Sequence, residues 1–303
     1  MSKEFDLVVI GGGPGGYAAA FLAAEFARTP DWLRLLVTSR PDPEVRYPFQ
    51  AFTPRVLNAS WPENLDDIRA FLRHELAPYA DGGEVHEPVL ETVLTRSEGI
   101  FLYVEWVRQE VAAGRLSLAE PEEFPKGLGA VYAQYVARQF PDAAAYKDQI
   151  APALDAVAAA REPLDLSMLS AMFGWGQRRR HEFQASLGSL FTTTGGRILP
   201  FHKSVLDWLT DPHRAGPYFI SPEEGNQRLA DACWAEYQSG PQKLSPYAMA
   251  HLPEHLIAIE RWDDLETLLT DIFYVEAKNQ AGRVFDLAAD FFAAVAALPQ
   301  DRP

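Results

Sequence analysis

The sequence is poor in cysteine. Its 303 residues include one, Cys233. A single cysteine excludes a disulfide within the chain, a cysteine-rich zinc site and any reaction that needs two thiols of one chain. A reducing compartment, the cytoplasm, is therefore expected. Cys233 itself lies between Ala232 and Trp234 in a segment with helical character, which predicts a buried thiol rather than a nucleophile.

The sequence is also short of positive charge. It holds 27 lysine and arginine residues against 42 aspartate and glutamate residues, a formal net charge of −15. The electric field of such a chain repels nucleic acid and anionic membranes, so binding to either requires a local basic patch. We expect protein partners that bind through helical surfaces.

Long apolar runs are missing as well. No uncharged apolar run reaches the roughly 18 residues that a membrane-spanning helix needs, and the first letters, MSKEFD, lack the regions of a secretory signal. The sequence predicts a protein that is neither secreted nor membrane-spanning. The apolar stretch FFAAVAAL, residues 291–298, is too short to span a bilayer and is interpreted as a helix that packs on its neighbours.

Glycine, by contrast, is concentrated near the start. The apolar residues 7–10 lead into Gly11, Gly13 and Gly16, which have the G-x-G-x-x-G spacing, and small residues follow. In a strand–turn–helix unit these glycines permit a tight turn, a close approach of the backbone to a pyrophosphate, and close packing of helix on sheet. The pattern predicts a dinucleotide site, or the same turn without a ligand.

The residues around these glycines depart from both nucleotide motifs. A dinucleotide fold needs a carboxylate at the end of the second strand, about 20 residues beyond the glycines. Asp31 comes before that strand, which ends at residues 38–40, although Arg40 could hold the 2′-phosphate of NADP. For a P-loop, Tyr17 and Ala18 stand where the lysine and the Mg²⁺-binding hydroxyl belong.

The rest of the chain is expected to be helical. Apolar residues at helical spacing predict helices at residues 64–76, 87–99 and 100–114, and the first has an inner face of Leu65, Ile68, Phe71, Leu72 and Leu76. Ser60 and Glu63 have the spacing of a capping box for that first helix. A proline-rich boundary follows at residues 117–127, and residues 127–140 predict another buried helix face.

The segment 162–209 has the order of a winged helix. It predicts a helix, a Gly-Trp-Gly turn, a second helix, a hairpin that turns at Gly195 and Gly196, and a further helix. We therefore expect a mainly α protein with a small Rossmann-like or P-loop-like α/β remnant at residues 1–58. A helical subdomain is expected at residues 59–118, a winged-helix domain at 119–215, and a helical linker or solenoid-like region at 216–303.

Two other patterns have competing interpretations. The letters HLPEH, residues 251–255, fit H-x-x-E-H, a zinc-protease pattern, but Pro253 stands between the histidines, which favours the start of a helix there. Arg178, Arg179 and Arg180 precede the second helix of the winged-helix segment. They could bind DNA phosphates, but on an acidic chain a solvated helix start or a salt-bridge patch is favoured.

The first residues carry one family resemblance. MSKEFDLVVIGGGPGGYAAAFLAA, residues 1–24, resembles the N-terminus of dihydrolipoamide dehydrogenase, an FAD-dependent disulfide oxidoreductase. The resemblance implies FAD at Gly11, Gly13 and Gly16. That family continues into a strand that ends in an acidic residue and then into a redox-active cysteine pair, and this sequence has neither.

Residues 22–303 carry a second resemblance. LAAEFARTPDWLRLLVTSRPDPEV resembles the sensor strand of a NACHT-type STAND NTPase, and SEGIFLYVEWVRQEV its small helical subdomain. FPKGLGAVYAQYVARQF and FHKSVLDWLTDP are similar to the two ends of its winged helix, and YAMAHLPEHLIAIERWDDL to its helical linker. The resemblance implies that Arg40 faces the terminal phosphate and that His202 contacts the diphosphate of ADP. The residues around His202 leave a second interpretation open, in which this histidine caps the helix that follows it. The two resemblances meet at residues 21–26, which predicts a chimeric sequence.

The resemblances give three functional hypotheses. The leading one is a regulatory or scaffolding fragment of a NACHT-type signalling ATPase that holds ADP or ATP weakly through Arg40 and His202. It would lack ATP hydrolysis, because the lysine, hydroxyl and acidic cluster of phosphoryl transfer are missing. The alternatives are an FAD-dependent oxidoreductase and a winged-helix DNA binder. No metal ligands or catalytic residues are predicted.

Overall fold

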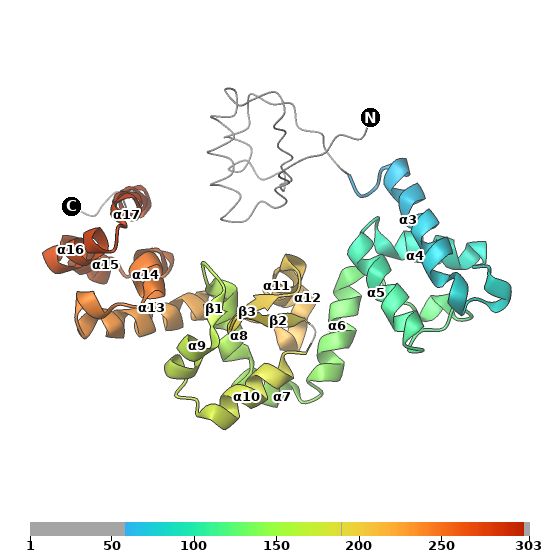
Figure 1. Ribbon diagram of the computed structural model, residues 1–303, viewed down its shortest axis with the longest axis horizontal. Helices are drawn as coiled ribbons and strands as arrows, with labels where there is room; N and C mark the ends of the chain where they lie inside the picture. The colour runs from blue at the N-terminus through green and yellow to red at the C-terminus, as the bar shows by residue number, and fades with distance from the viewer. Residues whose placement is uncertain (1–57, 189, 300–303) are drawn as a thin grey trace, which may run out of the picture. The chain divides into compact units, whose positions relative to one another are not determined.

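The computed structural model describes residues 58–188 and 190–299. The chain divides into two compact units, Met1–Asn64 and Leu65–Pro303. The predicted strands of residues 1–57 and the glycine turn lie outside the described residues. Within the described part the chain is mainly α-helical, with helices α3 to α17 and one small sheet (Figure 1). The expectation of a mainly α protein is confirmed at this level.

The first helices form a core of their own. They are α3 (Pro62–Leu76), α4 (Glu87–Ser97) and α5 (Phe101–Ala112), with 3₁₀ turns at Ala77–Tyr79, Asp81–Gly83 and Pro121–Glu123. The predicted inner face of α3 is confirmed, because Ile68, Leu72 and Leu76 are fully buried and Leu65 and Phe71 pack against them. The hydroxyl of Tyr103 donates to the carbonyl of Pro125 at 2.5 Å and ties the boundary segment to this core.

The capping box expected at Ser60 and Glu63 is wrong in detail. Helix α3 begins at Pro62, whose fixed φ angle suits the first position of a helix. Ser60 is therefore two residues ahead of the helix, and its hydroxyl bonds to the side-chain oxygen of Asn58 at 2.9 Å.

Helix α6 (Gly127–Gln139) belongs to two cores. Val131 packs into the first core, with α3 to α5, whereas Tyr132 and Val136 pack into the second core, which extends from residue 132 to residue 294. Leu128 contacts both. The predicted helix at residues 127–140 is thus confirmed as a buried one.

The middle of the chain combines short helices with the sheet. Helices α7 (Ala143–Gln149) and α8 (Ala151–Ala159) precede strand β1 (Leu164–Asp165), α9 (Leu166–Met172) and α10 (Gln177–Ser186). Strands β2 (Phe191–Thr194) and β3 (Arg197–Pro200) form the predicted hairpin, and α11 (Lys203–Leu209) and α12 (Pro212–Ala215) follow. The sheet is antiparallel in the order β1–β3–β2, with Leu164 and Thr193 both opposite Ile198.

The hairpin turn lies at the two predicted glycines. Gly195 and Gly196 have φ angles of 59° and 82°. Two consecutive residues with positive φ are what a tight two-residue hairpin requires, and glycine adopts them without steric cost.

The last helices are α13 (Pro222–Gln238), α14 (Pro246–Ala258), α15 (Trp262–Thr270), α16 (Ile272–Gln280) and α17 (Val284–Ala297). Ser221 and Ser245 cap α13 and α14, and each is followed by proline at the first helical position. The start of a helix expected at Pro253 is wrong, because Pro253 lies inside α14. The neighbouring Leu252 and Leu256 are fully buried, and this packing offsets the proline's lost hydrogen bond.

Candidate functional site

Of the predicted nucleotide-binding residues, the structure describes one. Gly11, Gly13, Gly16 and Arg40 lie outside the described residues. His202 is exposed and caps α11: its Nδ1 accepts from the backbone N–H of Ser204 at 3.2 Å and lies 2.7 Å from the Ser204 hydroxyl. An accepting Nδ1 places the ring proton on Nε2. The Ser204 hydroxyl in turn lies 2.6 Å from that of Tyr132 on α6.

The three arginines lie in the first turn of α10 and not ahead of it, which corrects the sequence interpretation. Gly176 has extended backbone angles and serves as the N-cap, so the helix begins directly after the Gly-Trp-Gly turn. Arg179 donates to the carbonyl of Gln149 at 2.6 Å and lies over the ring of Trp175. The positive charge of Arg180 helps to lower the pKa of Asp165, after the larger effect of the hydrogen bonds from Ser167.

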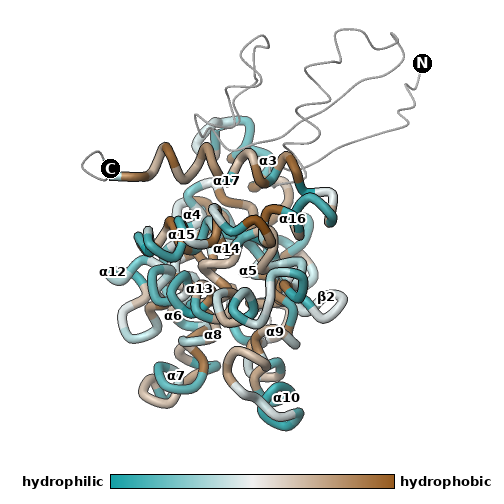
Figure 2. The backbone as a smooth tube through the Cα atoms, turned by 90° about the vertical axis from the view of Figure 1, so that its left-hand side faces the viewer, coloured by the Kyte–Doolittle hydropathy of each residue, from teal (hydrophilic) through white to brown (hydrophobic). Residues whose placement is uncertain are grey.

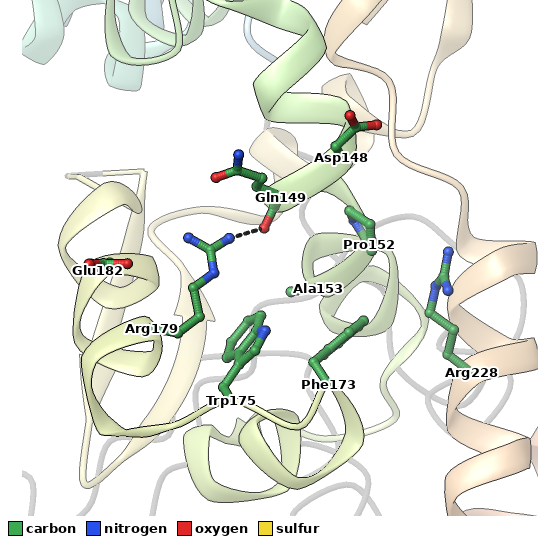
Figure 3. A pocket seen from close by; sticks show the side chains of 9 residues that line it. All are labelled: Asp148, Gln149, Pro152, Ala153, Phe173, Trp175, Arg179, Glu182 and Arg228. Carbon is green, nitrogen blue, oxygen red and sulfur yellow. Dashed lines mark hydrogen bonds between the residues drawn. The ribbon is translucent and has the colours of Figure 1, made fainter.

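A pocket of about 530 Å³ lies beside this turn (Figure 3). Phe173 and Trp175 are stacked with ring centres 5.2 Å apart, and Arg179 and Arg228 flank them on opposite sides. Both guanidinium groups already have partners, Gln149 for Arg179 and Glu224 for Arg228, the latter at 3.0 Å. Asp148 and Glu182 balance the two positive charges in the lining. The residues that line the pocket include no serine, cysteine, histidine or lysine, and its ionisable acidic groups are Asp148 and Glu182.

A second groove, of about 910 Å³, separates α9 from α13 and the start of α14. Its apolar lining includes Met168 and Met172 on one side and Ala232 and Ala235 on the other. The lining also contains four carboxylates and two arginines: Glu162, Asp165, Asp231, Glu236, Arg197 and Arg228. Methionine-lined grooves adapt to apolar side chains, so this groove is suited to binding an apolar segment.

The histidines of HLPEH do not form a metal site. His255 is fully buried, and its two ring nitrogens bond to Asn226 at 2.8 Å and to the hydroxyl of Tyr247 at 2.9 Å. Burial, with help from Arg161 and His251, lowers the pKa of His255 to about 3, so the ring is neutral. Within the described residues no three histidine, cysteine, aspartate or glutamate side chains are placed to hold a metal ion.

Cys233 lies on α13 and is fully buried, as predicted. Burial raises the pKa of its thiol to about 12. A thiol that stays protonated at neutral pH is a poor nucleophile, so Cys233 has a packing role.

An exposed apolar area covers α16 and α17, and Figure 2 shows α17 as a predominantly hydrophobic segment. Phe285 is 90% exposed, Phe292 77% and Val295 72%. The area, called here the α16–α17 surface, consists of exposed apolar residues on both helices and at the C-cap of α17: Ile272, Phe273, Val284, Phe285, Phe291, Phe292, Val295 and Leu298. Isolated exposed apolar residues are ordinary, whereas these eight gather on two helices that follow one another in the chain and contact each other.

Sequence reasoning predicted the helix at residues 291–298 but not its exposure. The signal was present: between Val284 and Ala297 the only charged residues are Asp286 and Asp290. Only Asp290 and Ala294 of this helix are buried in the described structure. The expectation that this helix packs on its neighbours is therefore confirmed only for the side of α17 that contains Asp290 and Ala294.

The chain matches no protein-family model, and a search of curated proteins finds no significant match. Among residues 58–188 and 190–299, no helix has both the length and the apolar character that crossing a membrane requires.

Proposed function

We propose that this protein is a regulatory or scaffolding component of the NACHT-type signalling ATPase class, which acts through protein contacts and does not hydrolyse ATP. The α16–α17 surface carries the proposal, because exposed apolar residues grouped on adjoining elements need a protein or a membrane to cover them.

The arrangement of the middle segment supports the winged-helix part of this proposal. Helices α8, α9 and α10 are followed by the β2–β3 hairpin, and β1, between α8 and α9, pairs with β3. A winged helix is a helix-turn-helix variant in which a β-hairpin follows the second of the two helices. Here α9 and α10 are the two helices, and β2 and β3 form the hairpin. A helical core precedes this segment and further helices follow it, in the order that the NACHT resemblance implies.

The nucleotide part of the proposal concerns Arg40 and His202. We propose that ADP or ATP, where bound, is held weakly by these two side chains. Nδ1 of His202 is occupied in the cap of α11, so Nε2 is the ring atom left to contact a phosphate. FAD at Gly11, Gly13 and Gly16 is the alternative, and duplex DNA at α10 is the third hypothesis, weakened by the contacts of Arg179.

Photo-crosslinking tests the central claim. The purified full chain is prepared with p-benzoylphenylalanine in place of Phe285, and separately in place of Phe201, which is 55% exposed but lies outside the α16–α17 surface. We expect a protein adduct from position 285, with purified chain alone or with cell extract added, and none from position 201. Absence of adducts from position 285 in both conditions would contradict a contact surface there.

Nucleotide assays separate the alternatives. We expect no ATP turnover, a colourless protein, and at most a small rise in melting temperature with ADP or ATP. A ligand that binds the native state alone raises apparent stability, so a large shift with FAD, or a yellow protein, would replace the proposal with the oxidoreductase hypothesis. Steady ATP hydrolysis would remove the non-hydrolysing claim.

A further inference from the structure

Helix α17 is apolar nearly all round its circumference. Phe285, Ala288, Ala289 and Phe292 face away from the buried side, which contains Asp290 and Ala294. A helix that is hydrophobic on every side is normally buried in the native assembly. The described residues bury one side of α17, so the composition of the helix calls for a cover on the other.

Both charged residues of α17, Asp286 and Asp290, have a cationic partner. Lys278 is fully buried on α16 and pairs with Asp290, and Arg283 bonds to Asp286 at 2.7 Å. The outer side of α17 therefore presents no uncompensated charge, although the chain as a whole carries −15. A second copy of an acidic chain is repelled over most of its surface but can approach this area. A strongly charged partner would find no counter-charge on α17.

The sizes of the exposed residues are self-complementary. Phe285 and Phe292 are one heptad apart, and Ala288, Ala289 and Ala296 lie between and beside them. In an antiparallel pair of α17 helices, each phenylalanine of one copy can enter the space above the alanines of the other. With a two-fold axis midway between Phe285 and Phe292, both copies contribute the same surface to the interface.

The area is large enough for a stable contact. Buried aromatic side chains remove roughly 150–250 Å² each from water, and the α16–α17 surface holds four phenylalanines and four aliphatic residues at 40–90% exposure. Coverage of this set removes on the order of 800 Å² per copy, the size of a standard specific interface.

We propose that the α16–α17 surface is the interface of a symmetric homodimer of this chain, formed by antiparallel packing of the two α17 helices. The inference rests on the proposed function in that it names the partner of the same surface. Residues near the axis, Ala288 and Ala289, then face their own counterparts.

Sedimentation velocity of the full chain tests the dimer. We expect a concentration-dependent dimer for the natural sequence and for the control Phe201→Glu, and at least a roughly tenfold weaker dimer for Phe292→Glu. Circular dichroism and the melting temperature of the monomer check that Phe292→Glu folds, and Phe292→Ala serves where it does not. A monomeric natural chain, or a dimer that Phe292→Glu leaves unchanged, overturns the proposal.

Charge complementation tests the symmetry. Ala289→Glu and Ala289→Lys each place like charges across the axis, so each variant alone should be monomeric, and an equimolar mixture should form a heterodimer. Failure of the mixture to associate overturns the antiparallel arrangement. The crosslink at position 285 separates the two proposals: an adduct of twice the chain mass supports the homodimer, whereas an adduct of another mass, with a monomeric chain, retains the scaffold function and rejects the homodimer.

Discussion

At the residue scale, the contact between α8 and α13 depends on the absence of one side chain. A Cβ atom on Gly225 would lie 2.0 Å from the carbonyl oxygen of Asp155 and 2.8 Å from the Cβ of Ala159. The backbone of α8 cannot give way without moving the whole helix, so the two helix axes are close only because residue 225 is glycine.

We expect Gly225→Ala to lower the free energy of unfolding by roughly 3 kcal/mol, the upper range for an overpacked core. Urea denaturation measures the change. The control is Gly176→Ala, where a Cβ meets nothing within 4 Å and the expected change is below about 1 kcal/mol. Equal losses in both variants would contradict the close contact.

Asp155, in the same contact, makes stability depend on pH. Burial raises its pKa to about 6, against the opposing effects of the hydrogen bond from the Ser221 N–H and of Arg228. An unfolded aspartate has a pKa of about 3.9. The folded state therefore holds more protons between these two values, and stability falls as the pH rises through this window.

We expect Asp155→Asn, which cannot ionise and can still accept from Ser221, to be more stable than the natural chain at pH 7.5 by on the order of 2 kcal/mol. The two proteins should converge near pH 4. Asp290, whose pKa burial also raises to about 6, titrates in both and cancels in the comparison. Urea unfolding at several pH values gives the difference, and a constant difference across this range would exclude Asp155 as its source.

At the scale of elements, the cap of α11 links the predicted nucleotide residue to folding. His202 accepts the N–H of Ser204, and loss of a helix cap costs about 1 kcal/mol. We expect His202→Ala to lower stability by that amount without any nucleotide, and His202→Asn, a good cap, to restore it.

The same pair of variants separates the two roles of His202. A thermal shift with ADP that both His202→Ala and His202→Asn abolish would assign the imidazole to the phosphate. A shift that His202→Asn retains would assign it to the cap alone.

Helices with a strong apolar period were predictable, and elements fixed by distant partners were not. The faces of α3 and α6 follow directly from residue spacing. Strand β1 has two residues and exists because Leu164 and Asp165 meet β3, more than 30 residues away. Pro253 misled the interpretation of α14 because packing around Leu252 and Leu256 outweighs a local preference.

The candidate sites were less predictable than the elements. His202 was identified together with its alternative role as a helix cap, and the structure has that cap. The buried set around His255 needs Asn226 from another helix, which no spacing within HLPEH indicates. The exposure of the α16–α17 surface depends on which other elements pack against these helices. The residue pattern of a helix shows which of its faces are apolar but not which faces are covered.

At the scale of the whole molecule, net charge opposes compactness. A formal charge of −15 repels itself, and dissolved salt screens repulsion between exposed charges over about 10 Å at 0.1 M. Exposed ion pairs such as Arg73–Glu87 weaken with salt too, but such pairs contribute little individually.

We therefore expect the melting temperature to rise by a few degrees between about 20 and 300 mM NaCl, because screening of the excess negative charge outweighs the loss of ion pairs. Differential scanning calorimetry at constant pH measures it. A fall in melting temperature would show that the exposed pairs dominate.

Helix α6 is an element that the two cores share. Its 13 residues form a rod about 20 Å long, with Val131 seated in one core and Tyr132 and Val136 in the other. A rod held at two places transmits rotation: a twist that displaces Val131 also swings Tyr132, whose hydroxyl touches Ser204 and, through it, His202. A rotation of α6 would therefore pass to the N-terminus of α11 through side chains in direct contact, from Tyr132 to Ser204.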